Sequence, residues 1–309
     1  MNSTKVREVL QMKIGILGGG AIGLLFAAYL ADNHDITIYT KRSEQAKKLN
    51  EAGLSLVSNN HKRHFKIKAE QLCNHPFDKD LVIVAVKQYH LKELLDKEKG
   101  LKNVHCNIVF IQNGMGHLSL LKDLINKNVY IGIVEHGALK LTDNSVEHTG
   151  IGQTKIAALK GSLDRGIVHS LETPHYFPFV LVEDWYSMVA EKLIINSAIN
   201  PLTAIYKIPN GELIRNPHFM KNMKELYNEI SSVIMIGDKC ESWNRIVEVC
   251  ERTAKNRSSM LKDIEEGRKT EIDAILGFII NEGASKNISL KLTPFLYDAI
   301  KGLEGQGRD

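Results

Sequence analysis

Residues 12–23 of the chain read MKIGILGGGAIG, an apolar run of strand length that leads directly into a glycine-rich turn. The residues that follow, 21–33, have the apolar pattern of a helix. Gly18, Gly20 and Gly23 fit the spacing G-x-G-x-x-G between the two. A glycine-rich loop by itself is a common turn, but a position between a strand and a helix makes the pattern informative.

Each glycine in this pattern has a physical role in binding a dinucleotide. The first permits a tight turn, the second lets the backbone approach a pyrophosphate, and the third lets the helix pack close to the strand. The start of the helix adds free N–H groups and the positive end of its dipole. We therefore expect a dinucleotide at this turn, with a structural turn of another α/β fold as the alternative. The expected contacts are Gly18, Gly20, Ala21, Ile22 and Gly23.

Strands and helices alternate as far as about residue 184. Further apolar runs of strand length occupy 35–39, 81–86, 107–111 and 129–134. Strands that are apolar on both faces and separated by helices are typical of a parallel sheet covered on both sides. The runs near 154–159 and 177–182 should extend or edge this sheet.

The character of the chain changes after Trp185. The remainder has helical periodicity, and Pro201, Pro209, Gly237 and Gly267 divide it into helices of ordinary length. We predict an α/β chain whose N-terminal part is a Rossmann, doubly wound sheet and whose C-terminal part is all helical. The predicted boundaries are an extension outside the fold at 1–11, a dinucleotide-binding domain at 12–184 and a helical substrate and closure domain at 185–309.

Composition excludes several classes of protein. The net charge is +4, from 40 basic and 36 acidic residues, and the basic residues are scattered, which argues against a nucleic-acid surface. The apolar runs are too short to span a membrane, and residues 1–11 do not resemble a signal peptide, so we expect no membrane association and a cytoplasmic protein. Four cysteines without a CxxC pair predict reduced thiols and no metal site: Cys73, Cys106, Cys240 and Cys250.

The end of the second strand indicates which dinucleotide binds. An NAD site places an acidic side chain there, but this chain has Lys41 and Arg42, and Asp35 lies at the wrong end of the strand. Cations at this point suit the 2′-phosphate of NADPH, because charge-assisted hydrogen bonds to phosphate are strong. A solvated helix start is the alternative explanation.

Two polar residues follow later strands of the sheet. Lys87 ends the run 81–86 and Asn113 follows the run 107–111, where ligands bind in open α/β sheets. Asn113 could bind the nicotinamide ribose, its carboxamide or the substrate. An Asn-Gly turn and a surface lysine are the alternatives.

Polar residues also line one face of an apolar helix. Lys192, Asn196 and Asn200 are four residues apart, so they share a face. Buried polar groups need partners, and a small polar substrate would supply them. A solvated stripe explains the lysine well but two asparagines poorly, because Asn is a weak helix former.

Across nearly all of residues 12–303 the chain resembles the ketopantoate reductase (2-dehydropantoate 2-reductase) family. Eight short matches in the same order carry the resemblance: GGGAIG at 18–23, VK at 86–87, QNGMG at 112–116, HTGIG at 148–152, EKLIINSAINPLTA at 191–204, PNGEL at 209–213, NRSSM at 256–260 and TEIDAILGF at 270–278. Two positions depart from the family: Lys41 stands where an Arg is usual, and Glu135 where a small or hydroxyl residue is usual.

The resemblance implies NADPH-dependent reduction of 2-dehydropantoate to pantoate, in pantothenate and coenzyme A biosynthesis. It implies Lys192 as the general acid with Glu271 as its acidic companion, and Lys87 and Asn113 beside the nicotinamide. The implied substrate-binding residues are Asn113, Asn196, Asn200, Asn210 and Ser259. Local alternatives are an acid in a helix first turn for Glu271, a turn for Asn210 and an ordinary helix serine for Ser259.

Two other functions stay open. One is a paralogous reductase of another 2-keto or β-hydroxy acid. The other is a non-catalytic NADP-binding sensor, which would have no use for an acid facing the hydride acceptor. A small-molecule substrate is the expected partner, and a homodimer is possible.

Overall fold

The computed structural model describes residues 11–72, 78–98, 101, 107–162, 167, 171 and 176–306. The chain forms two compact units: unit 1 is Met1–Gln112 with Lys122–Trp185, and unit 2 is Asn113–Leu121 with Tyr186–Asp309. The predicted extension, apart from Gln11, and both Cys73 and Cys106 lie outside the described residues.

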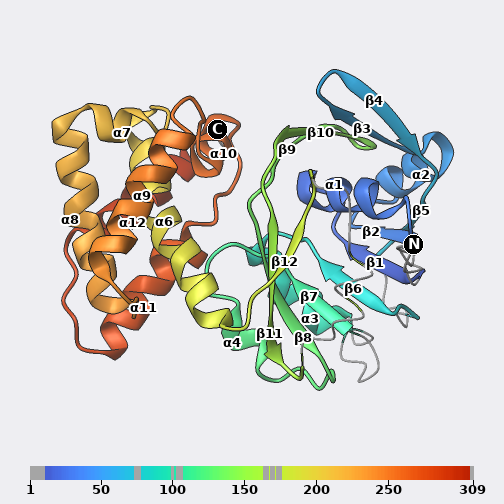
Figure 1. Cartoon of the computed structure of the whole chain (residues 1–309), viewed down its shortest axis with the longest axis horizontal. Coiled ribbons are helices and arrows are strands. Elements are labelled where there is room, and N and C mark those ends of the chain that lie inside the picture. The colour runs from blue at the N-terminus through green and yellow to red at the C-terminus, as the bar shows by residue number, and fades with distance from the viewer. Residues whose placement is uncertain are drawn as a thin grey trace, which may run out of the picture. The chain divides into compact units, whose positions relative to one another are not determined.

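Unit 1 is built on an eight-stranded sheet (Figure 1). Its order is β12 (Phe179–Leu181), β11 (Thr154–Lys160), β8 (Val129–Val134), β7 (Asn107–Phe110), β6 (Leu81–Val84), β1 (Lys13–Leu17), β2 (Asp35–Thr40) and β5 (Lys68–Gln71). The six strands from β8 to β5 are parallel, and β11 pairs antiparallel to β8. The predicted doubly wound sheet is thus confirmed, with the two late strands at its edge.

The order of the strands positions a ligand site. The chain runs outward from β1 to β2 on one side and then returns to place β6 on the other side of β1. In open sheets of this kind ligands bind at such a switch point, beyond the carboxyl ends of the strands. The glycine-rich turn follows β1 and therefore lies at that point.

A second sheet in unit 1 escaped the sequence analysis. Its strand order is β4 (His61–Phe65), β3 (Leu54–Ser58), β10 (Ser145–Gly150) and β9 (Gly137–Thr142). Polar residues break the apolar alternation in these strands, and β4 is exposed at four of its five positions. The two-residue turns were the available signal, since Asn59 and Asn60 both have positive φ, as a tight hairpin requires.

Helix α1 (Ala21–Leu30) packs against both sheets of unit 1 (Figure 1). It contacts β1 and β2 on one side and β3, β9 and β10 on the other. All residues from Gly23 to Leu30 are buried, as expected of a helix that is apolar around its whole circumference. The helix that follows the glycine-rich turn is therefore fixed by its packing against both sheets. Further helices among the described residues of unit 1 include α2 (Ser43–Ala52), the 3₁₀ turn η1 (Gln88–His90) and α3 (Leu91–Lys97).

The regular secondary structure of unit 2 is all helical among its described residues, which confirms the predicted fold class. Its elements are α4 (Leu118–Leu121), α6 (Trp185–Tyr206), α7 (Glu212–Arg215), α8 (Pro217–Val233), α9 (Lys239–Arg252), α10 (Ser259–Glu265), the π-helical turn η3 (Asp273–Gly277), α11 (Phe278–Ser285) and α12 (Leu292–Gly305). The prediction that Pro201 ends a helix is wrong, because α6 continues through it to Tyr206. Extensive burial of α6 outweighs the one helix N–H that proline lacks, and the Thr203 hydroxyl bonds to the Ile199 and Asn200 carbonyls.

Residues 113–121 belong with unit 2, although the sequence analysis places them in the first domain. The Met115 N–H donates to the Ala274 carbonyl at 3.3 Å, which ties this segment to η3. Gly114 has a φ of +76°, and a Cβ there would lie 2.2 Å from the Ala274 oxygen. Only glycine therefore fits this close approach.

Candidate active site

The glycine-rich turn of unit 1 has the geometry of a dinucleotide-binding loop. Gly18 has a φ of +116°, and its N–H donates to the Tyr39 carbonyl at 2.9 Å. A Cβ on Gly23 would lie 1.9 Å from the Gly18 oxygen, so the helix can approach the turn only without a side chain. Around Gly20, by contrast, a Cβ would meet no atom within 4 Å. The open space lies where a pyrophosphate would approach the backbone.

The start of α1 supplies donors toward that space. The N-cap residue is Gly20, which has no side chain that could accept hydrogen bonds from the first N–H groups of the helix. The first N–H groups of a helix have no acceptor within the helix, so those of Ala21, Ile22 and Gly23 can bind an anion. The first turn holds no acidic residue that would oppose one.

The residues after β2 are held in a defined conformation. The Thr40 hydroxyl donates to the Arg42 carbonyl at 2.8 Å, and Arg42 is the N-cap residue of α2. The side chains of both Lys41 and Arg42 are exposed. The Arg42 guanidinium donates to the Asp143 carboxylate at 2.5 Å. A basic group thus stands close to the glycine-rich turn, together with an acid from the β9–β10 turn.

Gln112 organises the carboxyl ends of β6 and β7, and the sequence analysis did not single it out. Its side-chain amide donates to the Val84 carbonyl at 2.8 Å and to the Val86 carbonyl at 3.0 Å. These bonds hold the backbone that leads to the half-buried Lys87. Its position beside Asn113 in the quoted QNGMG stretch was the signal that could have identified it.

The predicted polar face of unit 2 lies on α6. Lys192 and Asn196 are half-buried, and Asn200 is only 7% exposed. A freely solvated stripe does not describe these side chains. They lie where burial makes a polar partner necessary.

Glu271 and Asn113 are in direct contact, although 158 positions separate them in the sequence. The Asn113 side-chain amide donates to the Glu271 carboxylate at 2.9 Å, and Glu271 is 8% exposed. The Thr270 hydroxyl accepts a bond from the Ile272 N–H at 3.2 Å, so the local helix start proposed as the alternative is also present. A local helix start and a buried contact of the Glu271 carboxylate with Asn113 are therefore both present.

Asn210 and Ser259 have different surroundings. Asn210 is buried, and its amide donates to the Thr253 hydroxyl at 2.9 Å. Its side-chain oxygen has no hydrogen-bond partner among the residues that the structure describes. A buried acceptor without a partner fits a ligand site, because leaving it unpaired costs free energy. Ser259 is exposed at the start of α10, whereas its neighbour Ser258 caps that helix. The contacts of Ser259 within the described structure tie it to none of the other predicted site residues.

Glu135, one of the two departures from the family pattern, forms an ion pair with Lys155 at 3.1 Å.

Within the described part of the chain, His, Cys, Asp and Glu side chains do not cluster in a way that could hold a metal ion. The helices of that same part include none with the length and apolar content needed to cross a membrane.

Fold and turn together define a class: an α/β protein with a Rossmann-type unit that suits a dinucleotide and with a helical second unit. Two family models match the chain, one described as ketopantoate reductase PanE/ApbA over residues 14–161 and one as its C terminal over residues 184–304. The chain belongs to the ketopantoate reductase family. It is therefore an enzyme of a family of NAD(P)-dependent reductases.

Individual relatives agree over almost the full length. The 2-dehydropantoate 2-reductase of Bacillus subtilis (strain 168) is 39% identical over 295 residues, which cover 95% of this chain and 98% of that protein. The crystal structure of the probable 2-dehydropantoate 2-reductase from the same organism matches with a TM-score of 0.86, covering 94% of this chain and 99% of that one. A ternary structure of D-mandelate dehydrogenase with NADH and anilino(oxo)acetate shares the fold, with a TM-score of 0.85 at 22% identity, over 96% and 99% of the two chains.

Proposed function

We propose that the protein reduces 2-dehydropantoate to pantoate with NADPH, a step of pantothenate and coenzyme A biosynthesis. The observation that carries this proposal is the 39% identity, over 95% of the chain, to an enzyme named for that reaction. The contact between Asn113 and Glu271 supports it, because it joins two residues that the family resemblance assigns to one site.

The residues of unit 1 suit the cofactor. When bound, NADPH supplies the hydride. The open space at Gly20 and the free N–H groups of α1 fit its pyrophosphate. The exposed Lys41 and Arg42 would hold the 2′-phosphate, and Lys87 with Asn113 would contact the nicotinamide end.

Lys192 acts in this proposal as the general acid. Addition of hydride to the 2-keto carbon leaves negative charge on the oxygen, and a neighbouring ammonium would stabilise that charge and then donate its proton. Glu271 would favour the charged form of Lys192 in a poorly solvated site. Asn113, bonded to the Glu271 carboxylate at 2.9 Å, would fix the direction of that carboxylate.

The remaining polar residues would hold the substrate. Its carboxylate and hydroxyl need directional hydrogen bonds, and Asn196, Asn200, Asn210 and Ser259 offer donors and acceptors of that kind. The side-chain oxygen of Asn210, which has no partner in the described part of the chain, is the acceptor among them that most clearly needs a ligand. It would accept a bond from the substrate hydroxyl.

The test is the loss of NADPH absorbance with 2-dehydropantoate as the only acceptor. We expect a kcat/KM for this acceptor well above that for 2-ketoisovalerate and other 2-keto acids. A preference for another keto acid would instead identify a paralogous reductase. Tight NADPH binding without turnover of any keto acid would identify a non-catalytic sensor. Either result would overturn the proposal.

A further inference from the structure

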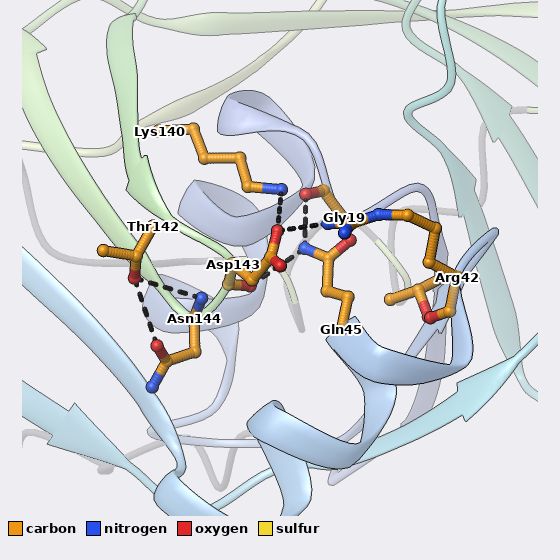
Figure 2. A network of polar contacts seen from close by, with 8 residues as sticks. Gly19, Arg42, Gln45, Lys140, Thr142, Asp143 and Asn144 are labelled. Carbon is orange, nitrogen blue, oxygen red and sulfur yellow. Dashed lines mark hydrogen bonds and ion pairs between the residues drawn. The ribbon is translucent and has the colours of Figure 1, made fainter.

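Two cations from different elements meet at one carboxylate beside the glycine-rich turn (Figure 2). Arg42 approaches from the end of β2, and Lys140 approaches from β9 of the second sheet. Both bond to the same oxygen of Asp143, at 2.5 Å and 2.9 Å respectively. Lys140 and Asp143 are half-buried, whereas Arg42 is more exposed.

The turn that carries Asp143 is anchored to the phosphate-binding loop. The buried side-chain amide of Gln45, on α2, donates to the Gly19 carbonyl at 2.8 Å and to the Asp143 carbonyl at 2.9 Å, as Figure 2 shows. On the other side of the turn, the Asn144 amide donates to the Gly53 carbonyl at 2.9 Å. The β9–β10 turn is therefore a fixed part of the loop's surroundings.

The charge balance of this cluster is positive. The hydrogen-bonded Lys140 ammonium is the main reason that the pKa of Asp143 lies below its ordinary value, and Arg42 lowers it further, so Asp143 stays ionised. Arg42 and Lys140 outnumber this one acid by one charge. The guanidinium has five donors and the ammonium three, so both retain donors after bonding to Asp143.

We propose that Lys140 is a further determinant of cofactor choice, which binds the 2′-phosphate together with Lys41 and Arg42. Asp143 is the positioning residue that holds Arg42 and Lys140 in place for it. This proposal rests on the NADPH preference proposed above. It assigns a role to the second sheet, which brings Lys140 to a site otherwise built from the first.

Asp143 could instead select NADH, and this alternative role predicts a different effect of mutation. A carboxylate near the adenosine ribose can also accept hydrogen bonds from the 2′-hydroxyl of NADH and repel a 2′-phosphate. Replacing Asp143 by Asn would then improve NADPH binding. In the positioning role the same change loosens both cations and weakens NADPH binding, so the sign of the effect separates the two.

The experiment measures dissociation constants of the intact protein by titration calorimetry, for NADPH, NADH, 2′,5′-ADP and 5′-AMP. The variants are Lys140→Ala, Lys140→Arg and Asp143→Asn. Lys68→Ala is the matched control, because Lys68 pairs with Asp35 at the opposite end of β2. Melting curves of each variant confirm that it is folded.

We expect Lys140→Ala to weaken NADPH and 2′,5′-ADP binding about tenfold, the scale of one charge-assisted contact, and to change NADH and 5′-AMP binding less than about twofold. Lys140→Arg should retain the preference, and Asp143→Asn should reduce it. Unchanged ratios in Lys140→Ala, or tighter NADPH binding in Asp143→Asn, would overturn this proposal while leaving the parent's NADPH preference intact. A parent protein that binds NADH as tightly as NADPH would instead refute the cofactor assignment itself.

Discussion

At the scale of the residue, one ammonium group carries the proposed chemistry. Lys192 lies half-buried on α6, on the same helix face as two asparagines. An ammonium group at such a place can stabilise the negative charge that forms on the oxygen of a reduced carbonyl.

Lys192→Ala should lower kcat by about 10²–10⁴, the usual contribution of a general acid. The dissociation constant of this variant for NADPH should stay within a few-fold of the parent's, because Lys192 is not among the proposed cofactor contacts. Steady-state kinetics and fluorescence titration measure the two quantities. Lys221→Ala, at an exposed position on α8, is the control. Near-parent turnover in Lys192→Ala would exclude the acid role.

Two glycines of the turn should respond differently to the same added methyl group. In Gly23→Ala the Cβ would lie 1.9 Å from the Gly18 oxygen, so α1 must shift and the melting temperature should fall by several degrees. In Gly20→Ala the Cβ meets no protein atom within 4 Å, so the melting temperature should hold while NADPH binding weakens. Thermal melts and cofactor titrations of the two variants test this contrast, and normal cofactor binding by Gly20→Ala would contradict it.

At the scale of the element, the short segment 113–121 and the π-helical turn η3 act as one piece. Insertion of a π turn into a helix is frequent at functional sites. Here it presents the Ala274 carbonyl to Met115 next to the contact between Asn113 and Glu271. The position of Asn113 therefore depends on backbone packing at Gly114.

Gly114→Ala should damage both stability and catalysis. Its φ of +76° disfavours alanine, and the Cβ would lie 2.2 Å from the Ala274 oxygen. We expect a loss of about 1–3 kcal/mol in the free energy of unfolding, together with a lower kcat, measured by urea denaturation and steady-state assay. Gly237→Ala, where a Cβ would meet nothing within 4 Å, should be neutral. Equal behaviour of the two variants would show that the segment tolerates rearrangement.

The sequence predicted the elements whose pattern is simple. Strands β1, β2, β6, β7 and β8 are largely apolar and buried on both faces of the main sheet, and α1 is apolar all around because it lies between two sheets. The second sheet stayed hidden because strand β4 reads HKRHF and is mostly exposed. Periodicity cannot reveal a strand that buries one residue in five.

The candidate site was predictable only in part, for a related reason. Spacing on a single element placed Lys192, Asn196 and Asn200 on one face of α6. The contact of Arg42 with Asp143 joins residues 101 positions apart and so brings Arg42 beside Lys140, which lies three positions before Asp143. A linear pattern carries no information on such a contact. The contact of Asn113 with Glu271 likewise depends on tertiary packing, and only the family resemblance had grouped those two residues.

At the scale of the whole molecule, buried histidines couple stability to pH. His117 in unit 2 is 0% exposed, and burial lowers its pKa to about 4. His136 in unit 1 also has its pKa lowered to about 4, first by burial and then by His148. The unfolded chain takes up these protons below about pH 6.5, whereas the folded chain does not until about pH 4.

The free energy of unfolding should therefore fall as the pH drops from about 6.5 toward 4, by up to roughly 3 kcal/mol for each histidine. Urea denaturation at pH 7.0, 6.0 and 5.0 measures this slope. His117→Asn removes one titrating imidazole and should flatten the slope, whereas His61→Asn, at an exposed position, should not. A pH-independent free energy of unfolding for the parent across that range would refute the assignment.

The membership of Asn113–Leu121 in unit 2 means that the polypeptide passes between the units three times, after Gln112, after Leu121 and after Trp185. A single proteolytic cleavage at any of these crossings would leave the two units covalently joined through the other crossings. A fragment that begins at residue 184 would lack residues 113–121, the segment that hydrogen-bonds to η3 in unit 2. We expect such a fragment to be insoluble until a peptide spanning residues 113–121 is supplied, which a solubility assay with and without the peptide measures.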